Sequence, residues 1–178
     1  MTNTAIRLRI LKQRWTLNPT IKKQLDSVIY NKTFKIVRLR NPSKYIACYW
    51  PMENEVDSIA IINDLLEGGH KVCLPYITNS KMFFKPITTI HFEYEYWKNM
   101  RQPVAGQTID IKDIELMIVP VVAFNKRLQR LGYGLHFYND YLKLTNKIYT
   151  VGLAYDFQLN NDFKTTARDK ILDIMITN

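Results

Sequence analysis

The stretch VPVVAFNKRLQRLGYGLHFYNDYL, residues 119–142, is the part of the chain from which we predict the fold. It continues an apolar run, residues 116–122, which is typical of a strand buried on both faces because neither face carries polar side chains. A basic loop and Gly132-Tyr133-Gly134 follow. In the next segment Phe137, Tyr141 and Leu144 share one helical face. The pattern therefore predicts a strand, a glycine-bearing loop and a helix.

A strand, a glycine loop and a helix in this order form an anion-binding arrangement. Glycine lets backbone N–H groups approach a phosphate closely, and the following helix directs the positive end of its dipole toward that phosphate. Glycine is also common at such junctions for conformational reasons alone. Periodicity by itself leaves a phosphate loop and an ordinary turn equally open.

The whole string resembles the signature of the 5-formyltetrahydrofolate cyclo-ligase (methenyltetrahydrofolate synthetase) family. In that signature a strand ending in Pro leads through a Phe-Asp or Phe-Asn turn to Arg-Leu-Gly-Tyr/Phe-Gly, then to Gly/Lys-Gly-Tyr-Tyr-Asp and a helix. The matching positions are Pro120, Phe124, Asn125, Arg130, Leu131, Gly132, Tyr133, Gly134, Tyr138, Tyr141 and Leu142. Three positions depart from it: Leu135 replaces Gly or Lys, His136 replaces Gly, and Asn139 replaces Asp.

The resemblance implies an enzyme that uses ATP and Mg²⁺ to close 5-formyltetrahydrofolate to 5,10-methenyltetrahydrofolate, with release of ADP and phosphate. Its implied partners are small molecules, the reduced folate and ATP, and we expect a monomer. The implied fold is a three-layer α/β sandwich with a mostly parallel central sheet flanked by helices. This fold is Rossmann-like and of the NagB/RpiA/CoA-transferase-like type.

The resemblance also implies ATP-binding residues at the N-terminus and in the glycine loop. In the family a Lys-x-x-Leu-Arg element reaches the nucleotide phosphates, and residues 3–7 align with it, with Asn3 in place of Lys and Arg7 retained. Arg can hold phosphate through two parallel hydrogen bonds, although most helical arginines are simply solvated. The implied ATP-binding set is Asn3, Arg7, Arg130, Gly132, Tyr133, Gly134, Leu135, His136, Phe137 and Tyr138, with Arg130 and Tyr138 as the candidate catalytic residues.

A second family segment, Tyr-x-Pro-x-x-x-Glu-Val, is matched by residues 49–56. The resemblance assigns Trp50, Glu55 and Tyr138 to the folate. A carboxylate such as that of Glu55 can accept two parallel hydrogen bonds from the amino and ring N–H groups of a pterin. The alternative is that Glu55 directly precedes a helix and interacts with its dipole. Both interpretations remain open at this point.

The implied magnesium ligands are Asn139, Asp140 and Asp173. The family has an Asp-x-x-x-Asp element whose second Asp contributes to magnesium binding, and Asp169 and Asp173 have that spacing. Asp140 follows Asn139, but adjacent side chains on a helix point about 100° apart, so a direct replacement needs local rearrangement. The alternative for Asp173 is a polar residue of an edge strand. The three histidines are scattered and show no ligand spacing.

Composition is consistent with one globular domain, residues 1–178, since 178 residues with 47% hydrophobic content suffice for a core. No apolar run approaches the roughly 18 residues of a membrane span, and no signal-peptide core is evident, so we expect a cytoplasmic protein. The net charge of +9 is spread along the chain, which favours anionic small molecules over nucleic acid. We expect Cys48 and Cys73 to be small buried hydrophobes.

The remaining pattern predicts alternating strands and helices, and hence a parallel sheet. We expect helices within residues 1–17, from Asn18-Pro19 onward, and over 56–67. We expect strands over 45–50, 70–74 (ending at Pro75) and 150–154. In the second helix the expected buried stripe is Ile21, Leu25, Val28 and Ile29. The aromatic segment 78–107 indicates an antiparallel excursion or lid-like insertion, in which packing is favoured over ligand stacking.

Two other functions stay open. The departures at Asn3, Leu135, His136 and Asn139 are compatible with a family member that has weakened catalysis and serves as a folate- or nucleotide-binding protein. A different transferase or kinase on a similar α/β scaffold is the second alternative.

Overall fold

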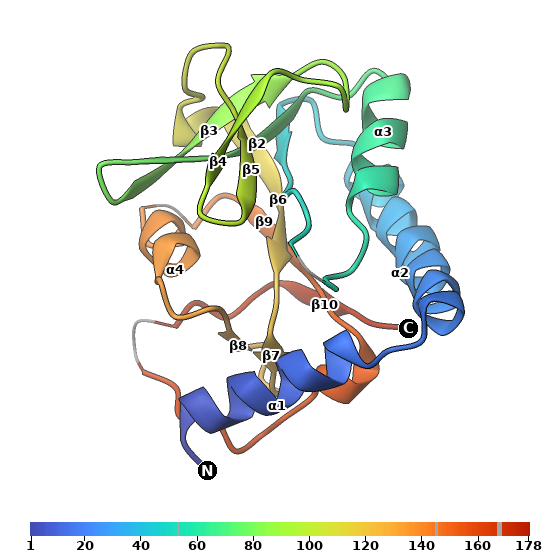
Figure 1. Ribbon diagram of the computed structural model, residues 1–178. Coiled ribbons are helices and arrows are strands. Elements are labelled where there is room, and N and C mark those ends of the chain that lie inside the picture. Colours follow the sequence, from blue (N-terminus) through green and yellow to red (C-terminus); the bar gives the residue numbers. More distant parts are fainter. Residues whose placement is uncertain (53, 145, 167–168) are drawn as a thin grey trace.

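The computed structural model describes residues 1–52, 54–144, 146–166 and 169–178. Along the chain, two helices precede β1 and α3, the strands β2 to β8 follow, and α4 precedes the last two strands (Figure 1). The helices are α1 (Asn3–Trp15), α2 (Pro19–Arg40), α3 (Ile59–Glu67) and α4 (Phe137–Leu142), with short 3-10 turns at Ile111–Asp113 and Asp156–Gln158. The strands are β1 (Tyr45–Ala47), β2 (Val72–Thr78), β3 (Lys81–Ile87), β4 (Tyr94–Trp97), β5 (Met100–Pro103), β6 (Ile114–Pro120), β7 (Ala123–Phe124), β8 (Arg130–Leu131), β9 (Tyr149–Leu153) and β10 (Ile174–Ile176).

The central sheet has the strand order β10-β9-β6-β1-β2-β3. Only the β2–β3 pair is antiparallel. From β1 the chain first moves outward through β2 and β3, then returns to β6 on the other side of β1 and continues to β9 and β10. The direction of winding therefore changes between β1 and β6, which is where open α/β sheets bind ligands beyond the carboxyl ends of their strands. The predicted mostly parallel α/β sheet is confirmed.

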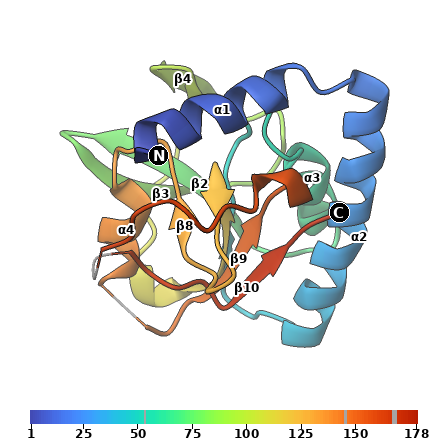
Figure 2. The same cartoon turned by 90° about the horizontal axis from the view of Figure 1, so that it is seen from below.

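Alternating side chains of the strands build two core layers. Ile46, Leu116 and Ile118 pack with residues of α2 and α3 on one face of the sheet. Their neighbours Ala47 and Met117 pack on the other face with residues of α4 and of the β4–β5 hairpin. Figures 1 and 2 show α2 and α3 together on one side of the sheet and α4 on the other. The predicted arrangement of helices on both faces is confirmed.

Helix α1 lies across the end of the molecule to which β6 leads, beside the small β7–β8 hairpin (Figure 1). Its buried Ile6 and Ile10 pack against Val122, Ala123 and Leu131. The residues between β7 and β8, predicted as a basic loop, form the turn of this hairpin. The Asn125 Oδ1 atom accepts hydrogen bonds from the N–H groups of residues 127 and 129, at 2.9 and 3.1 Å, and so fixes the turn.

Several predicted boundaries and faces are wrong. In α2 the cap Asn18 is as predicted, but Ile21 and Val28 are exposed, because burial falls on Ile29, Thr33 and Val37, one turn apart. Val28 is adjacent to Ile29 and therefore points about 100° away from the buried face. Leu144 lies beyond the end of α4 and is exposed, so it does not extend the face of Phe137 and Tyr141.

Strand β2 does not end at Pro75 but continues to Thr78 and pairs with β3 along its length. Proline is tolerated there because β1 pairs only with Val72 and Cys73. Further along, the Gln102 side chain replaces a strand partner: its Oε1 accepts from the Ile77 N–H at 2.8 Å and its Nε2 donates to the Ile77 carbonyl at 3.3 Å. The predicted antiparallel excursion is confirmed as β3 and the β4–β5 hairpin.

Cys48 and Cys73 are both buried and free, as expected. Within the described ranges, no helix combines the length and the apolar composition needed to cross a membrane.

Candidate active site

A cavity of about 320 Å³ lies at the winding switch between β1 and β6. Its size is within the range of small-molecule sites. All residues predicted to bind ATP or folate line this cavity, and Asn139 lines it as well. Those residues are Asn3, Arg7, Trp50, Glu55, Arg130, Gly132, Tyr133, Gly134, Leu135, His136, Phe137 and Tyr138. The fold thus brings the N-terminus, the segment after β1 and the glycine loop to one place.

Two arginines bracket the glycine loop. The Arg7 Nε atom donates to the Gly132 carbonyl at 2.7 Å. A Cβ atom at Gly132 would lie 2.7 Å from Arg130 Nη1, so a side chain there would require the buried Arg130 guanidinium to shift. Gly134 has a φ of +98°, a backbone conformation that L side chains rarely adopt, and it lies beside the Arg7 guanidinium. Gly132 is therefore favoured by the position of Arg130, and Gly134 by its own backbone conformation.

Neither of these guanidinium groups forms an ion pair with a carboxylate within the part of the chain that the structure describes. Arg130 is buried, its Nη2 donates to Asn139 Oδ1 at 3.0 Å, and its Nε has no hydrogen-bond partner among the described residues. Burial lowers the pKa of Arg130 to about 10, whereas the nearby Tyr138 and Asp169 raise it. Arg130 is therefore still positively charged at neutral pH, and among the described residues its nearest acidic influence is Asp169, with which it forms no direct ion pair.

Tyr138 lies against Arg130, with the guanidinium carbon 5.2 Å from its ring centroid. Burial raises the pKa of the Tyr138 phenol far above neutrality, although the charge of Arg130 lowers it. The phenol therefore stays neutral and offers a hydrogen-bond donor and an aromatic face. Helix α4 begins at Phe137, just before Tyr138, and has only six residues. The anion-binding character of this side of the cavity therefore rests on Arg7, Arg130 and the glycine loop.

The predicted metal residues separate in the structure. Asn139 is buried and lines the cavity, but Asp140 is exposed and pairs with Lys143 at 2.7 Å. Asp173 does not line the cavity. Its Oδ2 accepts from the N–H and the hydroxyl of Thr150, at 2.8 and 2.7 Å, where β10 begins. Neither Asp140 nor Asp173 lines the cavity, and their assignment as metal ligands stays a prediction.

Asp169, the first residue of the Asp-x-x-x-Asp element, is the carboxylate that reaches the cavity. The Asn139 Nδ2 atom donates to Asp169 Oδ1 at 2.7 Å, and the Thr166 N–H donates to Asp169 Oδ2 at 2.7 Å. Among residues whose positions are described, no group of three or more His, Cys, Asp or Glu side chains could hold a metal ion. On this side of the cavity the acidic group is thus Asp169, which lies beside the Asn139 amide.

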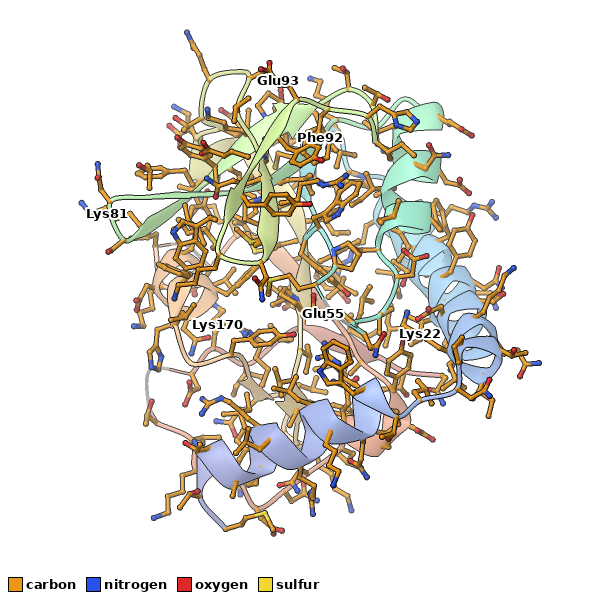
Figure 3. All side chains as sticks on the ribbon, in the orientation of Figure 1. Lys22, Glu55, Lys81, Phe92, Glu93 and Lys170 are labelled. Atoms are coloured by element: carbon orange, nitrogen blue, oxygen red, sulfur yellow. The ribbon has the colours of Figure 1, made fainter. Side chains whose placement is uncertain are left out.

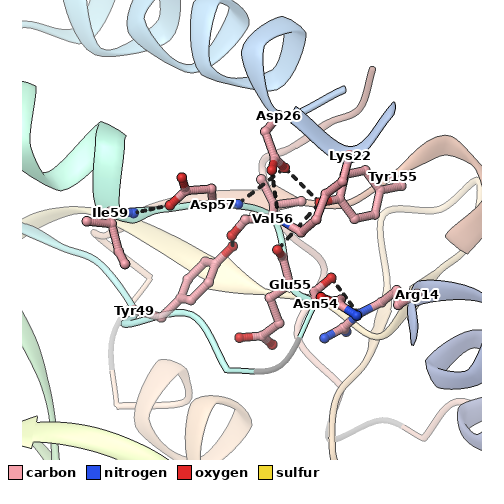
Figure 4. Close-up of polar contacts among 10 residues, drawn as sticks. All are labelled: Arg14, Lys22, Asp26, Tyr49, Asn54, Glu55, Val56, Asp57, Ile59 and Tyr155. Carbon is pink, nitrogen blue, oxygen red and sulfur yellow. Dashed lines mark hydrogen bonds and ion pairs between the residues drawn. The ribbon is translucent and has the colours of Figure 1, made fainter. Parts of the chain in front are cut away.

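Glu55 lies in the segment between β1 and α3, which is held along its backbone (Figure 4). The Tyr155 hydroxyl contacts the Glu55 carbonyl at 3.4 Å and donates to Asp26 Oδ1 at 2.7 Å, and that same Oδ1 accepts from the Asp57 N–H at 3.3 Å. The Tyr49 hydroxyl donates to the Val56 carbonyl at 3.1 Å. Neighbouring backbone groups are therefore tied to α2, to β1 and to the segment after β9.

The Glu55 carboxylate is 4% exposed, and its Oε2 accepts from the Met52 N–H at 2.8 Å. Helix α3 begins only at Ile59, so Glu55 does not directly precede a helix and the helix-dipole interpretation is wrong. In Figure 3 Glu55 lies near the middle of the molecule, far from Phe92 and Glu93 at the end opposite α1. An acidic group in this interior position suits a ligand that donates hydrogen bonds.

The β4–β5 hairpin forms another wall of the cavity, through residues 97–100. Trp97 meets Phe137 edge to face, with ring centroids 5.4 Å apart. On the opposite side of the hairpin Phe92, Tyr94 and Tyr96 contact one another in sequence. The aromatic segment thus supplies packing on one face and a cavity wall on the other.

Three contributors were missed from sequence: Asp169, the hairpin wall and Arg14. Asp169 was visible by its spacing to Asp173, but spacing does not say which carboxylate turns inward. Arg14 is 1% exposed and follows Arg7 by seven residues, so both lie on the buried face of α1. That periodicity was the available signal for Arg14. The aromatic segment was predicted as an antiparallel excursion or lid-like insertion, but the local pattern did not indicate that residues 97–100 form the cavity wall.

The fold and the site together define an α/β protein that places an unneutralised basic glycine loop beside an aromatic and acidic half-site. This chain belongs to the 5-formyltetrahydrofolate cyclo-ligase family, whose sequence model matches residues 1–178. It is 30% identical over 176 residues to 5-formyltetrahydrofolate cyclo-ligase of Mycoplasma genitalium, covering 98% of this chain and 96% of that protein. The Mycoplasma pneumoniae protein of the same name is 29% identical and covers 99% and 98%.

Solved structures agree. A 5,10-methenyltetrahydrofolate synthetase from Mycoplasma pneumoniae superposes with a TM-score of 0.83 at 28% identity, covering 99% of both chains. The Aquifex aeolicus 5,10-methenyltetrahydrofolate synthetase shares the fold, with a TM-score of 0.86 at 24% identity and coverage of 98% and 89%.

Proposed function

We propose that this protein catalyses the ATP-dependent cyclisation of 5-formyltetrahydrofolate to 5,10-methenyltetrahydrofolate, with release of ADP and phosphate. The observation that carries the proposal is the position of three groups around one cavity. Two are the guanidinium groups of Arg7 and Arg130, which form no ion pair with any described carboxylate, and the third is the buried Glu55. A polyanion suits the side of the cavity with the two arginines, and a ring system that donates hydrogen bonds suits the side with Glu55. Membership of the cyclo-ligase family over the whole chain supports both assignments.

The chemistry accounts for both halves. A formamide oxygen leaves poorly as hydroxide, so the terminal phosphoryl group of ATP is transferred to it first. The neighbouring amine of the folate then attacks the formyl carbon, the ring closes, and phosphate departs with the former formyl oxygen. Such a reaction depends on positioning and on neutralising phosphate charge, and it needs no covalent protein nucleophile.

Each residue has a role that its surroundings support. Arg7 and Arg130 neutralise and orient the phosphates beside the loop of Gly132 and Gly134. Glu55 accepts hydrogen bonds from the pterin, and its fixed backbone keeps the folate in register with the phosphoryl group. The neutral Tyr138 phenol, held next to Arg130, donates a hydrogen bond at the junction of the two substrates.

Magnesium, when bound with ATP, would add positive charge at the phosphates. The Asp169 carboxylate and the Asn139 amide oxygen are the ligands that fit it, since Mg²⁺ accepts hard oxygen atoms and often takes only one or two from the protein. Such a sparse site depends on the substrate phosphates for its remaining ligands. Because Asp169 is the one carboxylate assigned to this metal site, we expect the metal and the nucleotide to bind together.

The decisive assay follows the ultraviolet absorbance of methenyltetrahydrofolate in a mixture of protein, 5-formyltetrahydrofolate, ATP and Mg²⁺. We expect absorbance to grow only when both substrates are present, and to stop when a chelator removes the metal. Binding of both ligands without product would instead support the alternative of a folate- and nucleotide-binding protein. Calorimetric titration of each ligand separates that outcome from a complete absence of binding.

A further inference from the structure

Arg14 is a buried cation that the proposed chemistry leaves without a role. Its side chain is 1% exposed, although arginine is rarely buried so completely unless it is paired. It forms no ion pair in the described ranges of the chain, and its Nη1 has no hydrogen-bond partner there. Burying such a charge is costly, and an apolar residue of similar volume would pack at lower cost. Packing alone therefore does not explain Arg14.

The two contacts of Arg14 lead to both halves of the site. Its Nε donates to the Asn54 carbonyl at 3.1 Å, next to Glu55 (Figure 4). Its Nη2 donates to the Tyr133 hydroxyl at 2.9 Å, and Tyr133 lies in the glycine loop. Arg14 thus joins α1 both to the segment after β1, which carries Glu55, and to the glycine loop.

Tyr133 continues the chain of contacts toward Glu55. Burial raises the pKa of Tyr133, the charge of Glu55 and a hydrogen bond to it raise the pKa further, and Arg14 lowers it. The Tyr133 hydroxyl accepts from the Arg14 guanidinium, so its own proton is available for the Glu55 carboxylate. The side chains of Arg14, Tyr133 and Glu55 therefore form one chain of hydrogen bonds, which we call the relay.

We propose that Arg14 is a positioning residue which, through Tyr133, holds the Glu55 carboxylate in the orientation that binds the folate. This proposal rests on the proposed function of Glu55. Gly132 and Gly134 approach the phosphates through their backbones, whereas the ring of Tyr133 between them turns to the folate half.

The test compares Arg14→Gln, Arg14→Lys and Tyr133→Phe with the wild-type protein in steady-state kinetics. We expect Arg14→Gln and Tyr133→Phe to raise the folate KM about tenfold, because each loses a charge-assisted or buried hydrogen bond of the relay. The ATP KM should change less than about threefold, since neither change touches Arg7 or Arg130. Arg14→Lys keeps the charge and one donor, and should recover part of the loss.

A double-mutant cycle separates positioning from general support of the fold. In a Glu55→Gln background the Arg14→Gln change should have little further effect on folate affinity, because the relay then has no carboxylate to orient. Arg9→Gln, on the exposed face of the same helix, is the matched control and should leave both KM values unchanged. Thermal unfolding of every variant is recorded, and Tyr133→Phe carries the test if Arg14→Gln does not fold.

Additive effects of Arg14→Gln and Glu55→Gln, or equal increases in the two KM values, would overturn the proposal. So would normal folate affinity in Tyr133→Phe while wild-type protein binds folate, a result that leaves the proposed function intact. Folate binding measured by calorimetry gives the same comparisons if wild-type turnover is absent. A wild-type protein that binds no folate overturns the proposed function and this inference together.

Discussion

The two halves of the cavity are built in opposite ways. In the half proposed to bind phosphate, Arg7 and Arg130 face a loop in which Gly134 has a positive φ, and neither guanidinium forms an ion pair within the described residues. In the half proposed to bind folate, the backbone around Glu55 is tied to Asp26, Tyr49 and Tyr155. The first half thus presents cations to its ligand, whereas the second presents a carboxylate on a fixed backbone. Substrate charge should thus matter most in the first half and shape in the second.

The largest expected effect is the loss of Arg130. Replacing Arg130 with Gln should weaken ATP binding by about 1.5 to 3 kcal/mol, or roughly 10- to 150-fold, because a charge-assisted contact is removed from a desolvated site. Stability should not fall correspondingly, since the desolvation cost of the buried charge also disappears. Calorimetric ATP titration and thermal unfolding measure the two quantities. Arg127→Gln, an exposed arginine of the same hairpin, is the control, and equal losses in both variants would place the phosphate site elsewhere.

The next effect tests the folate half directly. Glu55→Gln should weaken folate binding by about 1 to 3 kcal/mol, because an amide accepts fewer hydrogen bonds from the pterin than a carboxylate. Its oxygen can still accept from the Met52 N–H, so the melting temperature should stay close to the wild-type value. ATP affinity measured without folate should not change. Unchanged folate affinity in this variant would remove Glu55 from the site.

A smaller and conditional effect is expected at Asn139, where the chain departs from its family. Asn139→Asp would place a second carboxylate 2.7 Å from Asp169, in place of the amide that now donates to it. The new carboxylate would also face Arg130, whose Nη2 now donates to Asn139 Oδ1 at 3.0 Å, so repulsion and attraction oppose each other without metal. Added Mg²⁺ should relieve the repulsion between the two carboxylates, and so stabilise the variant and raise its activity. Thermal unfolding with chelator and with Mg²⁺ measures the difference. A variant that is equally stable under both conditions would show that the metal does not reach these residues.

A loss of stability is expected from Tyr155→Phe, but with little effect on ATP. The change removes the hydroxyl that donates to Asp26 and contacts the Glu55 carbonyl, and it should cost about 0.5 to 1.5 kcal/mol of unfolding free energy. Folate affinity should fall less than in Glu55→Gln, because the carboxylate itself remains. Denaturant unfolding and folate titration together test this order. A larger folate defect here than in Glu55→Gln would reverse the assignment of roles.

The sequence predicted this architecture well where local pattern and tertiary contacts coincide. The apolar run before Pro120 and the Asn18-Pro19 helix start are examples, since each follows from burial or capping in its own segment. The motif residues of the loop and of the segment after β1 line one cavity because parallel strands share a carboxyl edge. Local pattern does not state which of two nearby carboxylates turns inward. Asp173 is committed to Thr150, and only the packing of β10 beside β9 decides that.

Arg14 also shows that local sequence does not determine which segments pack against a side chain. Its spacing from Arg7 places both on one face of α1, but that face is buried only because the β7–β8 hairpin and residues 54–55 fold against it. Glu55 does not directly precede a helix, because α3 begins only at Ile59. For Arg14 a distant segment determined what the side chain contacts, whereas for Glu55 the exact start of the next helix decided the question.

The smallest expected effect is a flat pH dependence of ATP affinity. Burial lowers the pKa of Arg130 to about 10, so the guanidinium is fully protonated at every pH well below that value. Bound phosphate favours the charged form, so affinity is lost only as pH rises through the pKa of the free protein, never as pH falls through it. Between pH 7 and 9 the dissociation constant for ATP, measured without Mg²⁺, should therefore change less than about twofold. The exposed-arginine control Arg127→Gln should show the same flat profile. A steep loss of affinity within this interval would mean that a group with a lower pKa holds the phosphates, and the contrast between the two halves would then rest on a different cation.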